Sequence, residues 1–413
     1  MKYDITITAP THKALSVIRT LLYSLDISLD QINSKTIHSY LNLKQQKDFN
    51  TGKTSFVPDK KKEILNTDLL IVDESSMVGE EIYEYIMQAI EQDKCKAVLF
   101  IGDYYQLPSV EGNISSVFHV ANRYKLKEIV RQAENSYIID ISTKARDIIK
   151  STNYEDIVKF IQNNSDVQLE IFYNHDEFIE DFTTPHDWYK NDKVLTSFTN
   201  KDVDYYNKLI RSKYWQAHNI HNPDTLIQGD KIIFQSAHVV NEKVVHQNSE
   251  IVEISEATKR TLTMKSKHVL YYWECKNVKN NEPFNVLDSQ SMGLYKILLN
   301  KQASKAKQTK NYQEKQQEWK KFFTFKEFFV DVKYTFSSTI HKLQGSTYDT
   351  VYIDLVSLAQ SFENTKDKDL FYRLIYVALT RAAKHIKILL PQNDSYIHYE
   401  KQRDILSNMD FDF

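Results

Sequence analysis

Short apolar runs alternate with apolar positions at helical spacing through the first hundred residues. Tyr3–Thr8 is predicted to form a strand, and apolar side chains between Ala14 and Leu25 then recur at helical spacing. Leu69–Val72 and Ala97–Ile101 are continuous apolar runs that end in polar turns. Because such runs are apolar on both faces and separated by helices, they indicate a parallel sheet covered on both sides. The predicted fold class is α/β.

The pattern changes in the middle of the chain. Residues 228–290 carry short runs of alternating polar and apolar positions, which predict a small antiparallel β-barrel inserted in the α/β fold. Residues 296–326 follow with nine lysines against two acids, and they predict a basic helix with interleaved aromatic residues. Strand–helix alternation returns with a strand predicted at Tyr334–Phe336 and continues to Leu390. Earlier in the chain, the lysine-rich stretch 44–67 contains a turn signal and predicts a hairpin.

Composition narrows the class of protein. The chain has 413 residues, 41% of them hydrophobic and 26% charged, which excludes a disordered or fibrous chain and predicts two or three domains. No run of 18 apolar residues is present, so no membrane span is predicted. Cys95 and Cys275 are far apart and lack neighbours at ligand spacing, so a disulfide framework and a zinc site are not expected. A reducing cytoplasm is the expected compartment.

Glycine usage excludes a familiar type of phosphate site within these residues. The chain has seven glycines, and no two of them are five positions apart, as a phosphate-binding P-loop requires. The stretch Gly52-Lys53-Thr54 resembles the end of such a loop, but Lys47 stands where its first glycine would be. The same count excludes the dinucleotide-binding fingerprint.

Polar residues at predicted strand ends are the candidate chemistry. Asp73-Glu74 follows a buried strand, where one carboxylate could bind Mg²⁺ and the other could act on water; two acids in a solvated loop are the alternative. Gln106 follows the next strand and can hydrogen-bond a phosphate or water, although taken alone it is better explained by an ordinary surface loop. Arg131 and Arg381 each follow an apolar run, which suggests either a phosphate contact or a structural salt bridge.

A further polar segment, Thr339–Gly345, opens a predicted helix. Its hydroxyl, imidazole and ammonium groups suit phosphate oxygens, and an ordinary helix cap followed by exposed polar residues is the alternative. Net charge is −2, so a nucleic-acid partner would be held by local basic patches and not by overall charge.

The joint order of these segments resembles the motifs of superfamily 1 DNA helicases, in the RecD/Dda branch. The matching segments, in chain order, are Thr8–Ala14 (motif Ia), Lys35–Ser39 (the next DNA-facing motif), Val72–Met77 (motif II), Gly102–Pro108 (motif III), Arg131 (motif IV), Ser197–Asn200, Thr339–Gly345 (motif V) and Tyr376–Arg381 (motif VI). The resemblance covers nearly the whole chain, and so many motifs in the correct order are very specific.

The resemblance implies a role for each candidate. Asp73 would bind Mg²⁺, Glu74 would activate water, and Gln106 would couple the state of the ATP γ-phosphate to the grip on DNA. Arg131 and Arg381 would be arginine fingers. Gln344 and Gly345 would take part in nucleotide coupling. The expected DNA contacts are Thr11, His12, Lys13, His38, Thr199, Asn200, Thr339, His341 and Lys342.

The resemblance also implies a domain arrangement with two RecA-like motor domains. The expected boundaries are 1–150 for the first motor domain, with the 44–67 hairpin as a strand-separating pin; 151–227 and 332–413 for the second; and 228–331 for the inserted barrel and basic helix. The implied activity is ATP-dependent movement 5′ to 3′ on single-stranded DNA, in a bacterial or phage-infected cell. ATP and Mg²⁺ are the implied cofactors.

One feature of the family is missing from these residues. In the family the P-loop precedes motif Ia, which here begins at Thr8. We therefore expect the chain alone to be inactive and an N-terminal segment encoded elsewhere to be a partner. We also expect the motif Ia and motif III strands to have unpaired edges. The alternative is a non-catalytic single-stranded-DNA-binding protein. The acidic and aromatic end of the chain, Asn408–Phe413, suggests docking to a single-strand-binding protein or a frayed terminus.

Overall fold

The computed structural model describes residues 3–27, 32–59, 61–109, 114–126, 137–184, 187–240, 243–264 and 267–390. Internal contacts divide the described chain into two units. Unit 1 holds residues up to 41, 64–219 and 336 onward, and unit 2 holds 42–63 and 220–335. The hairpin segment thus makes its contacts with the inserted region. Arg131, the run before it and residues 391–413 lie outside the described residues.

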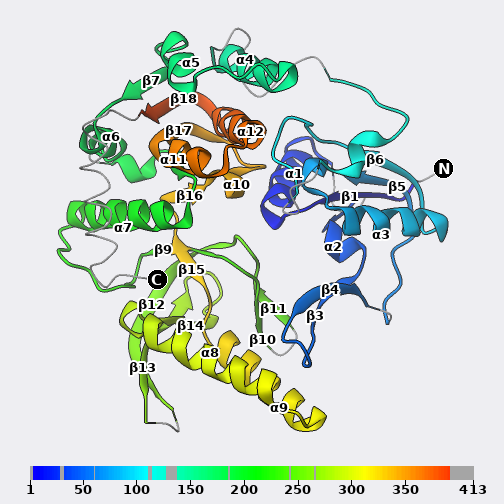
Figure 1. Ribbon diagram of the computed structural model, residues 1–413, viewed down its shortest axis with the longest axis vertical. Helices are drawn as coiled ribbons and strands as arrows, with labels where there is room; N and C mark the ends of the chain where they lie inside the picture. Colours follow the sequence, from blue (N-terminus) through cyan, green and yellow to red (C-terminus); the bar gives the residue numbers. More distant parts are fainter. Residues whose placement is uncertain are drawn as a thin grey trace. The chain divides into compact units, whose positions relative to one another are not determined.

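The first sheet of unit 1 is parallel and has the strand order β2-β1-β5-β6 (Figure 1). Its strands and helices are β1 (Ile5–Ala9), α1 (His12–Ser24), β2 (Ile32–Thr36), α2 (Ile37–Tyr40), β5 (Thr67–Val72), α3 (Glu80–Glu91) and β6 (Cys95–Phe100). The strands expected from the apolar runs are therefore present and parallel, as predicted.

The edges of this sheet correct one expectation. The motif Ia strand β1 pairs with β2 on one side and with β5 on the other, so the expectation that it has an unpaired edge is wrong. The motif III strand β6 pairs only with β5 in the described part of the chain, so its outer edge is open, as expected.

The second sheet of unit 1 is also parallel, with the order β16-β8-β17-β18-β7. Its strands are β7 (Leu169–Phe172), β8 (Lys193–Ser197), β16 (Ser337–Thr339), β17 (Tyr348–Asp354) and β18 (Ala382–Leu389). Its helices are α4 (Tyr137–Ser151), α5 (Ile157–Asn163), α6 (His175–Phe182), α7 (Asn200–Ala217), α10 (Ile340–Leu343), α11 (Leu355–Thr365) and α12 (Lys368–Leu379). Two parallel α/β sheets confirm the predicted fold class.

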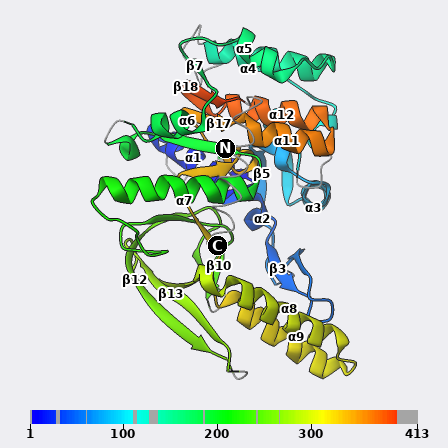
Figure 2. The ribbon, with the colours of Figure 1, turned by 60° about the vertical axis from the view of Figure 1, so that its left-hand side comes forward.

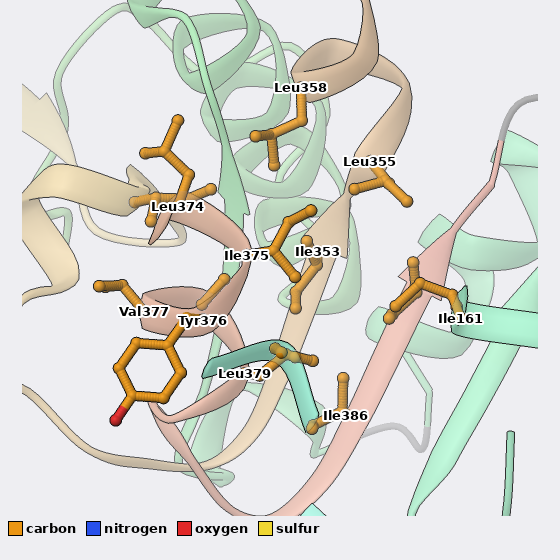
Figure 3. Packing of buried hydrophobic residues seen from close by; sticks show 14 of the residues in the cluster. Ile161, Ile353, Leu355, Leu358, Leu374, Ile375, Tyr376, Val377, Leu379 and Ile386 are labelled. Atoms are coloured by element: carbon orange, nitrogen blue, oxygen red, sulfur yellow. The ribbon is translucent and has the colours of Figure 1, made fainter. Parts of the chain in front are cut away.

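Helix α12 forms the centre of the core in this part of unit 1. Every residue from Phe371 to Leu379 is buried, which agrees with its almost continuous apolar sequence. Figure 3 shows Ile375 and Leu379 beside Ile353 of β17 and Ile386 of β18. Because truncating a fully buried Leu or Ile costs about 2–5 kcal/mol, this packing fixes the position of the polar residues at the end of α12.

Unit 2 contains a five-stranded sheet with the order β14-β13-β12-β9-β15. Its strands are β9 (Lys231–Phe234), β12 (Ile251–Thr263), β13 (Val269–Asn277), β14 (Pro283–Leu287) and β15 (Val332–Tyr334). Val286 of the outer strand β14 forms an isolated bridge with Val330, which precedes the other outer strand, β15, by two residues. A separate two-stranded ribbon joins β10 (His238–Val240) and β11 (Lys243–His246).

Unit 2 also contains a hairpin and a pair of helices. The hairpin joins β3 (Leu43–Lys47) to β4 (Thr54–Pro58), and α8 (Met292–Gln308) lies side by side with α9 (Tyr312–Glu327) (Figure 2). A small aromatic cluster connects them: Phe49 of the hairpin loop packs edge-on against Phe323 of α9, with ring centroids 5.8 Å apart.

Several predicted boundaries were wrong. The basic region 296–326 is two helices and not one, because the chain breaks at Thr309 and Asn311 caps the second helix. Two of the short β runs predicted within residues 228–290, at 250–254 and 261–264, are parts of one long strand, β12. The strand before motif V is β16, at 337–339, and not 334–336. Local alternation cannot show how far a strand extends once it has a long partner such as β13.

Candidate functional site

The two candidate carboxylates lie on a tight turn at the carboxyl end of β5. The Asp73 amide donates to the Thr8 carbonyl at 2.9 Å, so the turn is anchored to the neighbouring strand β1. Glu74 has a left-handed backbone, with φ of 49°. A non-glycine residue in that region is uncommon and costs of the order of 1–3 kcal/mol, so the surrounding structure holds it there.

Close packing at the ends of β5 and β6 provides that hold. The Ser75 amide donates to the Ile101 carbonyl at 2.9 Å. A Cβ atom on Gly102 would lie 2.5 Å from the Ser75 hydroxyl and 3.1 Å from the Ser76 amide nitrogen. Only glycine fits at position 102 without displacing the turn that carries Glu74.

The motif V segment reaches the same carboxylate from the other half of unit 1. Gly345 has a φ of 76°, and a Cβ there would lie 3.7 Å from Glu74 Oε1 and 3.4 Å from Ala14 Cβ. The structure therefore brings together Glu74 and Gly345, which the sequence placed far apart. Any larger side chain at position 345 would enter the space in front of the carboxylate.

Gln344 connects motif V to motif III. Its amide nitrogen lies 3.2 Å from Gln106 Oε1, 3.2 Å from Ser76 Oγ and 3.5 Å from the Leu107 carbonyl oxygen. Gln344 is buried, so these contacts are largely shielded from water. An amide has two N–H donors, and three acceptors compete for them. A change in the partner of Gln106 would therefore redistribute the bonds of Gln344.

Two residues of α12 that the sequence interpretation missed also hold the motif III loop. Arg373 is 4% exposed, and its guanidinium donates to the Gln106 carbonyl at 3.1 Å and to the Tyr104 carbonyl. The Tyr376 hydroxyl donates to Asp103 Oδ2 at 2.5 Å. A buried arginine inside an apolar helix needs hydrogen-bond acceptors. The sequence analysis applied this criterion to Arg381 and not to Arg373, although it holds equally for both.

Arg381 itself points into the protein. It is 1% exposed, and its guanidinium donates to the Val377 carbonyl at 3.1 Å, the Ser346 carbonyl at 3.2 Å and the Thr380 hydroxyl at 3.0 Å. These bonds connect the end of α12 to the residue after Gly345. An arginine-finger role would require the guanidinium to exchange at least one of them for a phosphate oxygen.

Most of the threonines predicted to contact DNA are helix caps. Thr11 accepts from the Ala14 amide at 3.1 Å, and Thr199 accepts from the Asp202 amide at 3.1 Å. Thr199 also donates to Asp202 Oδ2 at 2.5 Å. Thr339 occupies the N-cap position of α10 but makes no side-chain capping bond. Thr11 and Thr199 follow strands β1 and β8, and Thr339 is the last residue of β16, so the threonines mark strand-to-helix junctions at the carboxyl ends of parallel strands.

The predicted basic contacts differ in exposure. His12, Asn200, His341 and Lys342 are exposed, whereas His38 is half-buried and burial lowers its pKa. The remaining one, Lys13, donates to the Tyr348 hydroxyl at 2.9 Å, so it joins α1 to the start of β17. The sequence analysis did not predict Tyr348 as a partner of Lys13, because nothing in the sequence around Tyr348 indicates this hydrogen bond.

The donor set fits a nucleotide-bound metal better than a resident one. Asp73 and Glu74 supply carboxylate oxygens, which suit Mg²⁺. No group of three or more His, Cys, Asp and Glu side chains among the described residues is placed to hold a metal. The buried hydroxyls of Ser75 and Ser346, the residues that follow Glu74 and Gly345, have no hydrogen-bond partner in the described part. Mg²⁺ commonly combines one or two carboxylates with substrate phosphates, and this site offers that set.

Comparisons with known proteins agree with the motif order. A family model described as an AAA domain matches residues 1–168, and one described as a UvrD-like helicase C-terminal domain matches residues 334–389. The ATP-dependent DNA helicase dda of Enterobacteria phage T4 is 24% identical over 407 residues, covering 91% of this chain and 85% of that protein. An uncharacterised protein of Acanthamoeba polyphaga mimivirus is 21% identical, covering 92% of this chain and 88% of the relative.

Solved structures of similar proteins include two Pif1 helicases. The enzyme from Candida albicans is 16% identical, with a TM-score of 0.44, over 98% of this chain and 96% of that one. A Bacteroides Pif1 bound to single-stranded DNA is 15% identical, with a TM-score of 0.44, over 98% and 95%. Separately, none of the helices in the described ranges is long and apolar enough to cross a bilayer.

Proposed function

Because this chain is a superfamily 1 helicase homologue of the Dda type, we propose that it is the greater part of an ATP-dependent motor that moves 5′ to 3′ on single-stranded DNA. The observation that carries the proposal is the meeting of three motif segments at one place: Glu74, Gly345 and the Gln106–Gln344 pair. Chance similarity of short motifs gives no reason for such a meeting. The direction of movement is inferred from the family resemblance.

In this proposal the carboxylates perform the hydrolysis step. Asp73 would hold Mg²⁺, which would neutralise charge on the ATP phosphates. Glu74 Oε orients water and accepts its proton, and the strained turn keeps the carboxylate in place before substrate arrives. Gln106 releases Gln344 when its side chain turns toward a phosphate, so the contact at 3.2 Å is the coupling element between the two sheets of unit 1.

We propose that DNA crosses the exposed polar ends of the strand-to-helix junctions. His12, His38, Asn200, His341 and Lys342 would face the phosphates there, as the family motifs imply. Such contacts make affinity fall steeply with salt and leave it indifferent to base sequence. A salt titration of binding to single-stranded oligonucleotides tests this, and a low-salt affinity too weak to measure would contradict it.

We also propose that the phosphate loop is supplied by an upstream strand–helix segment that pairs with the open edge of β6. On one face of the sheet Leu70 and Val72 are fully buried, whereas on the other Leu99 is 48% and Ile101 41% exposed. A parallel sheet normally has both faces covered. The second face is therefore bare next to the open edge.

The right-handedness of β–α–β crossovers also predicts on which face of the sheet the helix of this segment lies. Helix α1 packs on Ala9, which lies on the same face as Leu99, and α3 places Tyr83 against Phe100 on the opposite face. From the proposed strand beside β6, the chain would cross the sheet toward β1. That is the same direction across the sheet as the connection from β1 to β2. Because such crossovers are right-handed, its helix must lie on the α1 face, over Ile71 and Leu99.

Two measurements test the proposed function. A chain extended upstream by a P-loop segment should unwind a duplex that has a 5′ single-stranded tail and leave a 3′-tailed duplex intact. Hydrogen exchange at the β6 amides should slow in the extended chain, while β8 remains unchanged. Unwinding from a 3′ tail would contradict the direction, and unchanged exchange at β6 would contradict the proposed position of the segment.

A further inference from the structure

We propose that the lysine-bearing surface of α8 and the α8–α9 turn binds the phosphate backbone of double-stranded DNA. This surface, the α8 surface, consists of Lys296, Lys301, Lys307 and Lys310 with the polar residues between them. It belongs to unit 2 and shares no residue with the proposed single-strand track. The inference therefore goes beyond the proposed function.

The first argument is charge. Helix α8 has four lysines and no acidic residue in its 17 positions, and all four lysines are exposed. Lys296 and Lys307 are eleven residues apart, about three helical turns, so they lie on the same face of α8. A polyanion bound to that face would be attracted by both.

The second argument is that the nearby acids already have structural roles. Glu318 is buried between the helices, where it accepts from Lys321 and Gln302, both at 2.8 Å, and pairs with Lys305 at 3.2 Å. These contacts lower its pKa to about 2, the bond from Lys321 contributing most. Glu314 lies in the first turn of α9, after the Asn311 cap, where a carboxylate favours the helix terminus.

The lysines of the α8 surface, unlike Lys305, are consequently left without carboxylate partners in the part of the chain that the structure describes. Lys296, Lys301, Lys307 and Lys310 have no ion pair within the described residues. The exposed positions between them on α8 are the apolar Ile297 and the polar Asn300, Ser304 and Gln308, besides Lys305. The polar side chains are short or neutral donors, which contact phosphate oxygens together with lysine in protein–DNA interfaces.

The third argument is shape, which favours a duplex over a single strand. Lys296 and Lys307 are separated along a straight helix by about 16 Å, a length over which one strand of B-DNA carries about five phosphates. Single strands are usually held by stacking on exposed aromatic rings. Most aromatic rings of the helix pair are unavailable for stacking, since Trp319 and Phe323 are buried against the hairpin loop; Tyr312 is 61% exposed, but a single ring cannot stack a run of bases. Charges fixed on a rigid helix, with a single exposed ring beside them, match a rigid duplex better than a flexible single strand.

The test measures binding of the full chain to a blunt, fluorescently labelled duplex without nucleotide. The variant replaces Lys296, Lys301, Lys307 and Lys310 by Gln, which keeps helix propensity and removes four charges. The matched control replaces four other exposed lysines by Gln: Lys125, Lys150, Lys159 and Lys279. Circular dichroism and thermal unfolding verify that both variants fold like the parent.

We expect the α8 variant to bind the duplex at least tenfold more weakly at about 50 mM salt, and the salt slope to fall by up to about 3.6 units, at roughly 0.9 per lost phosphate contact. The control variant should bind like the parent, and single-strand affinity should be unchanged in both. Equal weakening in both variants would show a mere net-charge effect and overturn the proposal. Unchanged duplex affinity in the α8 variant, or binding to anionic phosphatidylserine vesicles in place of the duplex, would also overturn it.

The outcome is independent of the proposed motor activity. Glu74→Gln, which removes the proposed hydrolytic carboxylate, should leave duplex affinity unchanged. If the chain binds duplex through the α8 surface but the extended chain never unwinds, only the motor proposal fails. If the extended chain unwinds and the α8 variant still binds duplex normally, only the duplex proposal fails.

Discussion

Gly52 offers a sharp test of how the hairpin is held in unit 2. It lies in the turn between β3 and β4 with a φ of 72°, and its amide donates to the Asp48 carbonyl at 2.7 Å. A Cβ at this position would lie 2.2 Å from Cη2 and 2.3 Å from Cζ3 of Trp319, which is 2% exposed. The glycine is therefore required both by the backbone angle and by the packing of the indole.

We expect Gly52→Ala to destabilise unit 2 by about 2–5 kcal/mol. The left-handed backbone accounts for about 1–2 kcal/mol and overpacking against the indole for about 1–3 kcal/mol. Urea unfolding followed by tryptophan fluorescence, with hydrogen exchange of residues 43–58 to locate the loss, gives the measured value. Gly293→Ala is the matched control, because a Cβ on residue 293 would meet no heavy atom within 4 Å and its helical site favours alanine.

A double-mutant cycle separates the two contributions. Trp319→Leu removes the ring atoms that a Cβ on residue 52 would meet. In that background Gly52→Ala should cost only the backbone share of about 1–2 kcal/mol, which gives a coupling energy of about 1–3 kcal/mol. A cost for Gly52→Ala below about 0.5 kcal/mol in the parent, or no coupling to Trp319, would refute the reasoning.

Two further expectations concern single side chains. Tyr376→Phe removes the hydrogen bond to Asp103 and should lower the free energy of unfolding of unit 1 by about 1–2 kcal/mol, measured by urea unfolding; no change would show that the loop is held without it. His246 is fully buried, and burial lowers its pKa, so folding favours the neutral imidazole. The resulting contribution to the free energy of unfolding is complete above the pKa of the unfolded chain, near 6.5. Below that pH it should decline by up to about 1.4 kcal/mol per pH unit. Thermal unfolding of His246→Phe should lose that pH dependence, and an identical pH profile in parent and variant would contradict the assignment.

Much of unit 1 could be predicted because its strands are short and continuously apolar in sequence. Leu69–Val72 and Ala97–Ile101 read as strands since the apolar run, the length and the polar stop agree. The buried helix before Arg381 was equally clear from its continuous apolar sequence. These elements depend mainly on local pattern, so a single sequence carries enough information.

The contacts that build the site could not be predicted in the same way. The bond between Gln344 and Gln106 spans 238 positions, and that between Lys13 and Tyr348 spans 335. Nothing local distinguishes a glutamine that meets a partner across the fold from one in a surface loop. Likewise, the order of strands in the sheet depends on crossovers, so the sequence analysis correctly assigned an unpaired edge to β6 but wrongly assigned one to β1, which pairs on both sides.

The most direct test of the central claim is ATP hydrolysis in the presence and absence of single-stranded DNA. It is measured on the 413-residue chain, on the same chain extended upstream by a P-loop segment, and on the extended chain with Glu74→Gln. We expect DNA-stimulated turnover only in the extended chain with Glu74 intact, because the hydrolytic carboxylate and the phosphate cradle are both required. Robust turnover by the 413-residue chain alone, or undiminished turnover after Glu74→Gln, would contradict the account.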